Sequence, residues 1–199
     1  MECITFASIN TTNMIQHLHK KTKGIFSFIA ILSVLGILII SSCRKDEDFL
    51  FTMDYDLEVN IQPGLNTIEI HGTVLSDIQT QIEAYLATNG ITKNQITKIS
   101  SGSARMSEQL SGSGYGFIDR VEIYVVNPDD PVDRRLVFER LAVPQNTGQQ
   151  LELLGSLIDS KAYLTEETFD LNFEIRLRQT SPGLVKTRLQ LEFRVQVEQ

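Results

Sequence analysis

The stretch FDLNFEIRLRQTSPGLVKTRLQLEFRVQV, residues 169–197, determines the fold class that the sequence predicts. Apolar residues occupy every second position on both sides of Ser181-Pro182-Gly183, and mainly charged or amide side chains stand between them. Residues at a spacing of two share one face of a β-strand. We therefore expect two long antiparallel strands joined by a turn, each apolar on one face and exposed to water on the other.

The same alternation opens the folded part of the chain. Residues 51–61 carry apolar side chains at every second position, with polar side chains between them, and a Pro-Gly turn signal follows. Beyond the turn, Ile68, Ile70 and Val74 resume the alternation. This pattern predicts a second strand that buries these three residues and forms a hairpin with the first strand.

One helix is expected at residues 76–89. Ser76 and Gln79 have the spacing of a capping box, and Asn89-Gly90 provides a stop signal. Leucine and isoleucine side chains between these signals recur at spacings of three and four. This is the period of a helix with one apolar face.

The pattern between the helix and the final strands is less regular. The elements expected there, in order, are a short strand through 91–99, a Ser/Gly-rich loop at 100–116 with a brief strand at 104–107, strands at 121–127 and 136–143, and a short helix within 149–160. In the last of these segments, Leu151 and Leu153 taken alone fit a strand instead.

About seven to eight strands and one inserted helix predict a mainly β protein. Half-exposed antiparallel sheets must bury their apolar faces together, which favours an immunoglobulin-like or Greek-key β-sandwich. A jelly roll or a partly open barrel is the alternative. We expect a single domain over residues 51–199, with 42% hydrophobic and 22% charged residues excluding a disordered chain and a protein of many membrane spans.

The N-terminal segment has the layout of a secretory signal peptide, expected over residues 1–42. Three lysines precede an uncharged apolar run at 25–40, and small residues follow it. Met14 would open a signal peptide of ordinary length, so we expect translation to start there. The run is shorter than the about 20 residues that a membrane-spanning helix needs.

The four residues Ile40-Ser41-Ser42-Cys43 resemble the lipobox of bacterial lipoproteins. The resemblance implies that Cys43 is acylated, with palmitate among its acyl chains, and becomes the new N-terminus after cleavage. A thiolate is a strong nucleophile for this transfer, and several acyl chains hold a protein firmly on a bilayer. The alternative is an uncleaved membrane span with an incidental cysteine.

Residues 43–50 are expected to form a lipidated tether. The charges at 44–48 fit a solvated spacer, and they also resemble the export signal of Bacteroidota surface lipoproteins. The chain as a whole is similar to small surface lipoproteins of that phylum. The resemblance implies lipid anchoring in the outer membrane, and it leaves open whether the domain faces the periplasm or the cell surface.

The residue inventory argues against catalysis, and we expect no enzyme and no cofactor. His71 is the only histidine after the signal segment, and we expect it on the polar face of its strand. A catalytic triad would need His71 as its base, and no Gly-x-Ser-x-Gly motif accompanies it. A tetrahedral zinc site would need further histidine or cysteine ligands. The chain has a net charge of −7, and the signal segment carries a positive excess. The acidic remainder would repel nucleic acid.

Three surface features are candidate sites. The weak candidates for a calcium site are the oxygen-bearing side chains of Asn127, Asp129, Asp130 and Asp133. Carboxylates on the first strand, at Asp54, Asp56 and Glu58, are expected to face water without forming a catalytic pair. A basic patch across the final two strands could pair with Glu174 and Glu192 or bind an anion; it comprises Arg176, Arg178, Lys186, Arg188 and Arg194.

The leading expectation is a lipid-anchored envelope protein that acts as a binding or assembly module. Its partners would be the membrane, through the lipid anchor, and another envelope protein or a glycan. One alternative is a surface module that binds glycans or calcium, although the chain has no Trp on which a sugar ring could stack. A second alternative is a pilus-like subunit that uses its long last strand for strand exchange.

Overall fold

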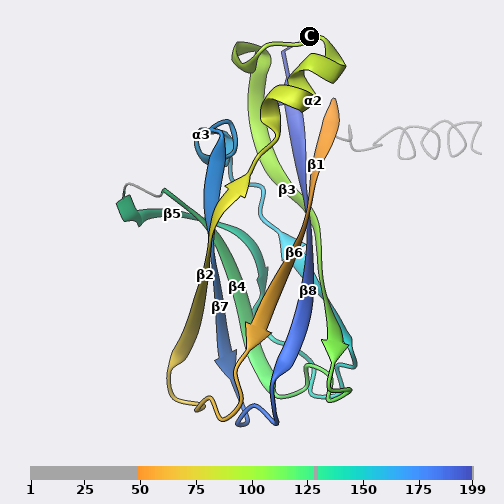
Figure 1. Ribbon diagram of the computed structural model, residues 1–199, viewed down its shortest axis with the longest axis vertical. Helices are drawn as coiled ribbons and strands as arrows, with labels where there is room; N and C mark the ends of the chain where they lie inside the picture. The colour runs from red at the N-terminus through yellow and green to blue at the C-terminus, as the bar shows by residue number, and fades with distance from the viewer. Residues whose placement is uncertain (1–48, 128–129, 199) are drawn as a thin grey trace, which may run out of the picture. The chain divides into compact units, whose positions relative to one another are not determined.

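The computed structural model describes residues 49–127 and 130–198. The signal segment, Cys43 and most of the tether lie outside the described residues. Strands make up most of the described chain (Figure 1): β1 (Phe51–Ile61), β2 (Ile70–Gln79), β3 (Ile96–Leu110), β4 (Ile118–Asn127), β5 (Asp130–Arg140), β6 (Gln150–Gly155), β7 (Thr168–Leu177) and β8 (Val185–Val197). Two short helices, α2 (Ile82–Asn89) and α3 (Lys161–Leu164), and one 3₁₀ turn, η1 (Lys93–Gln95), accompany them.

The eight described strands form one antiparallel sheet in the order β1-β8-β3-β6-β5-β4-β7-β2. The sheet curls until it is nearly closed, like a barrel, with β1 and β2 as its two edges (Figure 1). The prediction of a mainly β, antiparallel fold of about seven to eight strands is confirmed, with two short helices in the described chain where one was expected. The sheet is not clearly the predicted sandwich and is closer to the alternative, a partly open barrel. The pairing between neighbouring strands is shortest in the middle of the sheet, where β5 and β6 pair only at Phe138↔Gly155 and Glu139↔Leu154.

Both hairpins expected from the sequence are wrong. The edge strand β1 pairs along its whole length with β8, and the other edge strand β2 pairs with β7. The two long final strands are therefore not neighbours, since β7 lies between β4 and β2 while β8 lies between β1 and β3. Alternation indicates that a segment is a strand, but it contains no information on which strand becomes its neighbour.

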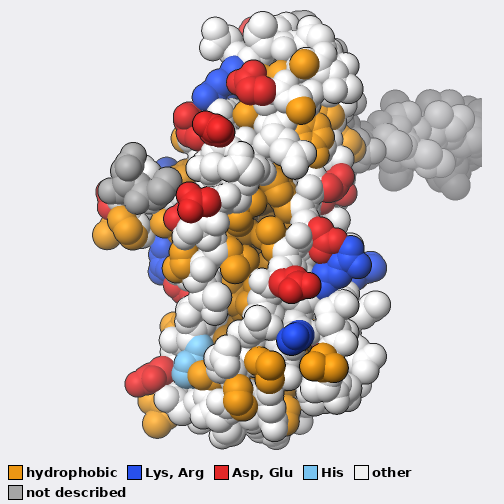
Figure 2. Space-filling view, in the orientation of Figure 1, with side chains coloured by type: hydrophobic (Ala, Val, Ile, Leu, Met, Phe, Trp, Pro, Cys, Tyr) orange, Lys and Arg blue, Asp and Glu red, His pale blue; other side chains and the backbone are white. Residues whose placement is uncertain are grey.

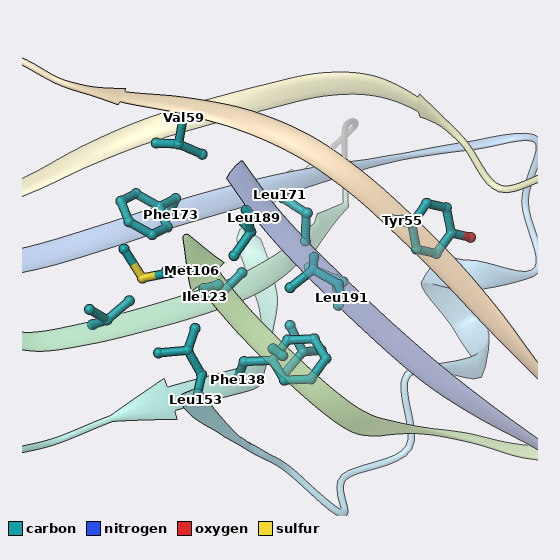
Figure 3. Packing of buried hydrophobic residues seen from close by; sticks show 14 of the residues in the cluster. Tyr55, Val59, Met106, Ile123, Phe138, Leu153, Leu171, Phe173, Leu189 and Leu191 are labelled. Atoms are coloured by element: carbon teal, nitrogen blue, oxygen red, sulfur yellow. The ribbon is translucent and has the colours of Figure 1, made fainter. Parts of the chain in front are cut away.

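The interior of the curled sheet is filled with side chains (Figure 3). Tyr55 of β1 meets the ring of Phe169 edge-on at 5.1 Å and that of Phe193 at 5.9 Å, and Phe138 of β5 meets Phe193 at 5.3 Å. All four rings are buried. Burial of a large apolar side chain contributes about 1.5–3 kcal/mol. This aromatic cluster therefore joins strands from distant parts of the sheet.

The second strand exposes the face that the sequence predicted to be buried. In β2, His71, Thr73 and Leu75 stand opposite buried residues of β7 and so face the interior. Ile70 and Val74 lie on the outer face and are 53% and 60% exposed. The pairing with β7 decides this orientation, because a shift by one residue would move every side chain of β2 to the other face.

The Ser/Gly-rich stretch expected as a loop belongs mainly to β3, a strand of 15 residues. Its pairing with β8 shifts at three places, one of them between Ser101 and Ala104. Bulges of this kind insert residues that break the simple alternation. Ser100 and Ser101 are buried although they are polar, which is why the sequence pattern missed the strand.

The helix starts later than expected, because residues 76–79 belong to β2. The predicted capping box does not form: the N-cap residue is Gln81, which makes no side-chain cap bond, and the Thr80 hydroxyl accepts a hydrogen bond from the Ile82 amide at 3.3 Å. The predicted end is correct: Gly90 adopts a left-handed conformation with φ of 66°. Glycine reaches this conformation without strain and commonly ends helices.

Two other elements differ from the expectation. The segment predicted as a short helix within 149–160 contains strand β6, in which Leu151 and Leu153 are buried opposite Met106 and Ala104 of β3. Strand β5 begins at Asp130 and ends at Arg140, so it starts earlier than the predicted 136–143. Its first residues are exposed, which is why they lack an apolar alternation.

Candidate functional site

The outstanding surface feature of the described chain is an open seam between the edge strands β1 and β2. The two strands are not paired with each other, and hardly any of their Cα atoms come within 8 Å of one another. Directly paired strands have Cα atoms about 4.5–5.5 Å apart. Figure 2 shows apolar side chains in the hollow between the two strands. We call this feature the β1–β2 seam.

The upper end of the β1–β2 seam is closed by contacts between β1 and the chain that follows β2. The Tyr55 hydroxyl donates a hydrogen bond to the Thr80 carbonyl at 3.0 Å, and the Phe51 ring stacks on Tyr85 of α2 at 5.5 Å. Burial raises the pKa of Tyr55 far above its usual value, so this hydroxyl stays protonated and remains a donor. This closure leaves the seam open only below Tyr55.

The lower end is closed by Ser181, which comes from the long connection between β7 and β8. Its hydroxyl donates to the Gln62 carbonyl at 2.7 Å and accepts a hydrogen bond from the Leu65 amide at 3.1 Å. Below Tyr55, β1 lines the seam with residues 56–61. This segment extends over about 20 Å, at about 3.4 Å per residue.

The floor of the seam is apolar and incompletely covered. Leu57 of β1 and Leu75 of β2 face inward but are only half-buried, and Thr73, which also faces inward from β2, is exposed. A cavity of about 260 Å³ occupies the lower part of the seam, where residues of β2, including His71 and Thr73, line it together with Phe173. Inward-facing residues of the paired strands β7 and β8 are fully buried by comparison.

The structure places His71 on the inner face of β2, whereas the sequence predicted the polar face. The ring lies half-buried at the lower end of the seam, and its Nε2 atom is 2.9 Å from the Asn66 carbonyl oxygen. His71 lies opposite Ile175 of β7, a buried apolar residue. The histidine thus helps to line the seam.

The carboxylates of the first strand do face water, as expected from the sequence. Asp54, Asp56 and Glu58 are exposed on the outer face of β1. Asp56 forms a two-pronged ion pair with Arg188, which holds the pKa of Asp56 below its usual value. Glu58 lies opposite Arg188 in the register, but in the described chain the Arg188 guanidinium binds Asp56 instead.

The residues of the predicted basic patch do not come together in one patch. Because β7 and β8 are separated in the sheet, Arg176 and Arg178 lie apart from Lys186, Arg188 and Arg194. Several of these cations have their own partners: Arg178 contacts Asp119 at 3.4 Å, Arg194 contacts Glu192 at 3.0 Å, and Glu174 pairs with Arg134. This pairing, within β8 for Arg194 and between neighbouring elements for Arg178, favours ion pairs over an anion site.

The candidate calcium ligands lie around the turn from β4 to β5, and Asp129 among them is outside the described residues. Asn127 stands opposite Asp130 in the register, and the Asp130 carboxylate accepts a hydrogen bond from the Val132 amide at 3.1 Å. Asp133 accepts a hydrogen bond from the Tyr163 hydroxyl. Among the described residues, no group of three or more acidic, histidine or cysteine side chains could hold a metal ion. The calcium site stays a prediction.

The turn that follows β3 is organised around the carboxylate of Glu108. The amides of Gly114 and Ser113 donate to it at 2.8 and 3.2 Å, and the Ser111 hydroxyl donates as well. Burial raises the pKa of Glu108, but these hydrogen bonds outweigh it, so that its pKa lies below the usual value. Glu108 therefore holds the end of the Ser/Gly-rich segment in a defined conformation.

Replacing Glu108 with glutamine is expected to lower the free energy of unfolding by about 1–2 kcal/mol at pH 7, because amides bind a carboxylate more strongly than a neutral group. Since the pKa of Glu108 is lowered in the folded state, its contribution is present at neutral pH and is lost as the pH falls through that pKa. Urea unfolding at several pH values measures both effects.

The matched control for this change is Glu198→Gln, because Glu198 is exposed near the end of the described chain. We expect little change in the free energy of unfolding for the control. A Glu108→Gln variant as stable as the control at pH 7, or equally destabilised at pH 7 and in acid, would contradict the assignment.

Sequence reasoning missed the β1–β2 seam altogether. Its only sequence signal is the neutral stretch around Gly72, Thr73 and Val74, which lacks the acidic side chains that line β1. No described helix is long and apolar enough to cross a membrane, and the lipidation candidate Cys43 lies outside the described residues. No protein-family model and no curated protein matches this chain.

Proposed function

We propose that this chain is a lipid-anchored, non-enzymatic module of the bacterial cell envelope, and that it binds a protein partner in the β1–β2 seam. The observation that carries the proposal is a pair of long edge strands that flank an incompletely covered apolar floor. Edge strands present unpaired N–H and C=O groups, which pair readily with another chain. Addition of a strand to such an edge is a common mode of peptide binding.

The length of the edges supports a binding role. Natural proteins protect exposed edges with short strands, prolines or covering segments. In this chain β1 has 11 residues and β2 has 10, and neither contains proline. In a protein that had no partner for these edges, such a seam would promote aggregation.

The finer architecture of the proposal is that of a flattened immunoglobulin-like Greek-key sandwich. Its layers would be β1-β8-β3-β6 and β5-β4-β7-β2, joined along one side by the two residue pairs between β5 and β6. Contacts between the layers, such as Phe138 with Phe193 and Tyr55 with Phe169, support this description. A short joint on one side and an open seam on the other would allow the seam to widen for a partner.

The anchor part of the proposal depends on the lipobox resemblance at Cys43. Acylation of this residue would attach the domain to the outer membrane, facing either the periplasm or the cell surface. A module held at a membrane meets other envelope proteins at high local concentration, which allows modest affinities to suffice.

Strand exchange in the manner of a pilus subunit is the second candidate function. The last strand β8 is held between β1 and β3, so it has no free edge to offer a neighbour. The free edges belong to β1 and β2. If the chain does take part in strand exchange, we infer that it accepts a strand and does not donate β8.

A photo-crosslinking amino acid placed at position 73 tests the function in living cells. We expect discrete adducts with one protein from position 73, because Thr73 is exposed within the seam. Position 150 is the control, because Gln150 is an exposed strand residue of β6 and not of the edge strands. Sequencing of the adduct identifies the partner. Identical products from both positions, or no adduct from position 73, would refute the proposal.

A further inference from the structure

We propose that the occupant of the β1–β2 seam is a single extended protein segment, with aliphatic side chains at alternate positions and lysine or arginine at the positions between. This inference rests on the proposed function and deepens it by assigning the chemistry of the partner. The argument uses the width of the seam, its floor and the charges on its rim.

The direction of the edges suits one inserted strand, and their separation leaves room for it. Neighbouring strands lie about 4.8 Å apart, so one inserted strand would separate its two flanking strands by roughly 10 Å. Hardly any Cα atoms of β1 and β2 approach within 8 Å, which is compatible with this spacing. Every neighbouring pair in the eight-stranded sheet is antiparallel, so β1 and β2 run in opposite directions. The inserted strand would therefore lie parallel to one edge and antiparallel to the other.

The floor of the seam sets the inner face of the occupant. Leu57 and Leu75, both half-buried, offer apolar surface, and the cavity of about 260 Å³ above the buried Phe173 leaves room for aliphatic side chains. Successive residues of a strand point to opposite faces, so only every second residue of the occupant meets this floor. We expect most of these residues to be apolar, because Leu57 and Leu75 face them, while His71 and Thr73 at the lower end offer hydrogen-bonding groups to one polar side chain.

The rim of the seam sets the outer face. On the β1 side stand Asp56 and Glu58, and of these Glu58 has no cationic partner in the described chain. On the β2 side stand Ile70 and Val74, both more than half exposed. A lysine or arginine between these two rows would cover the apolar side chains with its methylene groups and bring its charge to the carboxylates.

Strand β8, which pairs with β1, already has a residue pattern of this kind. On its paired edge, residues 55–61 of β1 lie beside the segment Val-Lys-Thr-Arg-Leu-Gln-Leu, residues 185–191. Val185, Leu189 and Leu191 are buried, while Lys186 and Arg188 stand on the outer face beside the carboxylates of β1. The free edge of the same β1 segment presents the same outer row of carboxylates, so we expect it to favour a strand of the same kind.

A synthetic peptide with the sequence VKTRLQL tests the proposal directly. Its binding to the mature, lipidated protein in non-ionic detergent is measured by fluorescence anisotropy. We expect saturable binding of VKTRLQL. The affinity for the peptide VETELQL, in which glutamate replaces the lysine and the arginine, should be at least tenfold lower. Hydrogen exchange should show new protection in β1 and β2. Absence of saturable binding by VKTRLQL, or protection confined to other strands, would overturn the proposal.

Two protein variants localise the effect. Thr73→Asp places a charge on the floor of the seam and is expected to lower the affinity for VKTRLQL at least tenfold. The control Gln150→Asp on β6 should leave this affinity unchanged. Glu58→Gln should lower the affinity for VKTRLQL about threefold and leave the affinity for the neutral peptide VQTQLQL unchanged. This second variant keeps the test valid if Thr73→Asp fails to fold. Equal effects of Glu58→Gln on both peptides would overturn the charge assignment.

The peptide test and the crosslinking test can fail separately. If position 73 gives a discrete protein adduct in cells while VKTRLQL does not bind, the partner chemistry inferred here is wrong and the proposed function stands. If VKTRLQL binds as expected while position 73 gives no adduct in cells, the seam has the inferred preference and the cellular function is refuted.

Discussion

Replacing Cys43 with alanine is expected to leave the leader uncleaved and to abolish acylation. The reason is that the lipobox resemblance assigns the acyl acceptor to this thiol, and no other side chain near it could replace the nucleophile. Labelled palmitate should be incorporated into the native chain and not into the variant. The variant should therefore keep the apolar run 25–40 and lack the acyl chains, each of which contributes about 0.8 kcal/mol per buried methylene to the anchor of the native protein.

Ser41→Ala is the matched control, because it replaces one small residue of the same motif with another and leaves the Cys43 thiol in place. This variant should incorporate palmitate and fractionate like the native protein. A Cys43→Ala variant that matures normally and still incorporates palmitate would remove the lipoprotein assignment, and with it the envelope localisation. It would leave the argument from the β1–β2 seam untouched.

The Phe193→Ala variant is expected to lose about 3–5 kcal/mol of the free energy of unfolding, because it deletes a large buried ring and leaves a cavity. Phe193 is fully buried in β8 and contacts the rings of Tyr55 and Phe138, which belong to strands on different sides of the interior. Domains of this size have free energies of unfolding of about 5–15 kcal/mol. Urea unfolding should show a large fall in the midpoint, or a variant that is partly unfolded without denaturant.

Leu154→Ala is the control for this substitution, since Leu154 is 60% exposed at the end of β6. We expect the free energy of unfolding of this control to change by no more than about 0.5 kcal/mol. Equal destabilisation by the two substitutions would show that the aromatic cluster does not hold the curled sheet together.

The strands with the most regular alternation were predictable from the sequence. The strands β1, β4, β7 and β8 occur where the apolar spacing indicated them. In each of them one face packs on the interior and the other faces water, so apolar and polar residues alternate along the sequence. Strands without this alternation were missed. In β3, for example, bulges and the buried Ser100 and Ser101 interrupt it.

The candidate site could not be predicted, because the neighbours of each strand are set by the whole chain. The sequence pattern predicted that β1 and β2 pair in a hairpin, and two paired strands have no seam between them. The orientation of β2 shows the same limit, since Ile70 and Val74 would be buried if local alternation alone decided. The pairing of His71 and Thr73 with Ile175 and Phe173 of β7 overrides that preference.

By itself, the sequence determined that this chain is mainly β and that most of its long strands have one apolar face, because hydrophobic burial acts on each strand locally. Only the tertiary structure decided that β1 and β2 become the unpaired edges of one curled sheet. The physical reason is that backbone hydrogen bonds between strands have no side-chain specificity. The order of strands follows from the joint packing of all apolar faces, which no single segment contains.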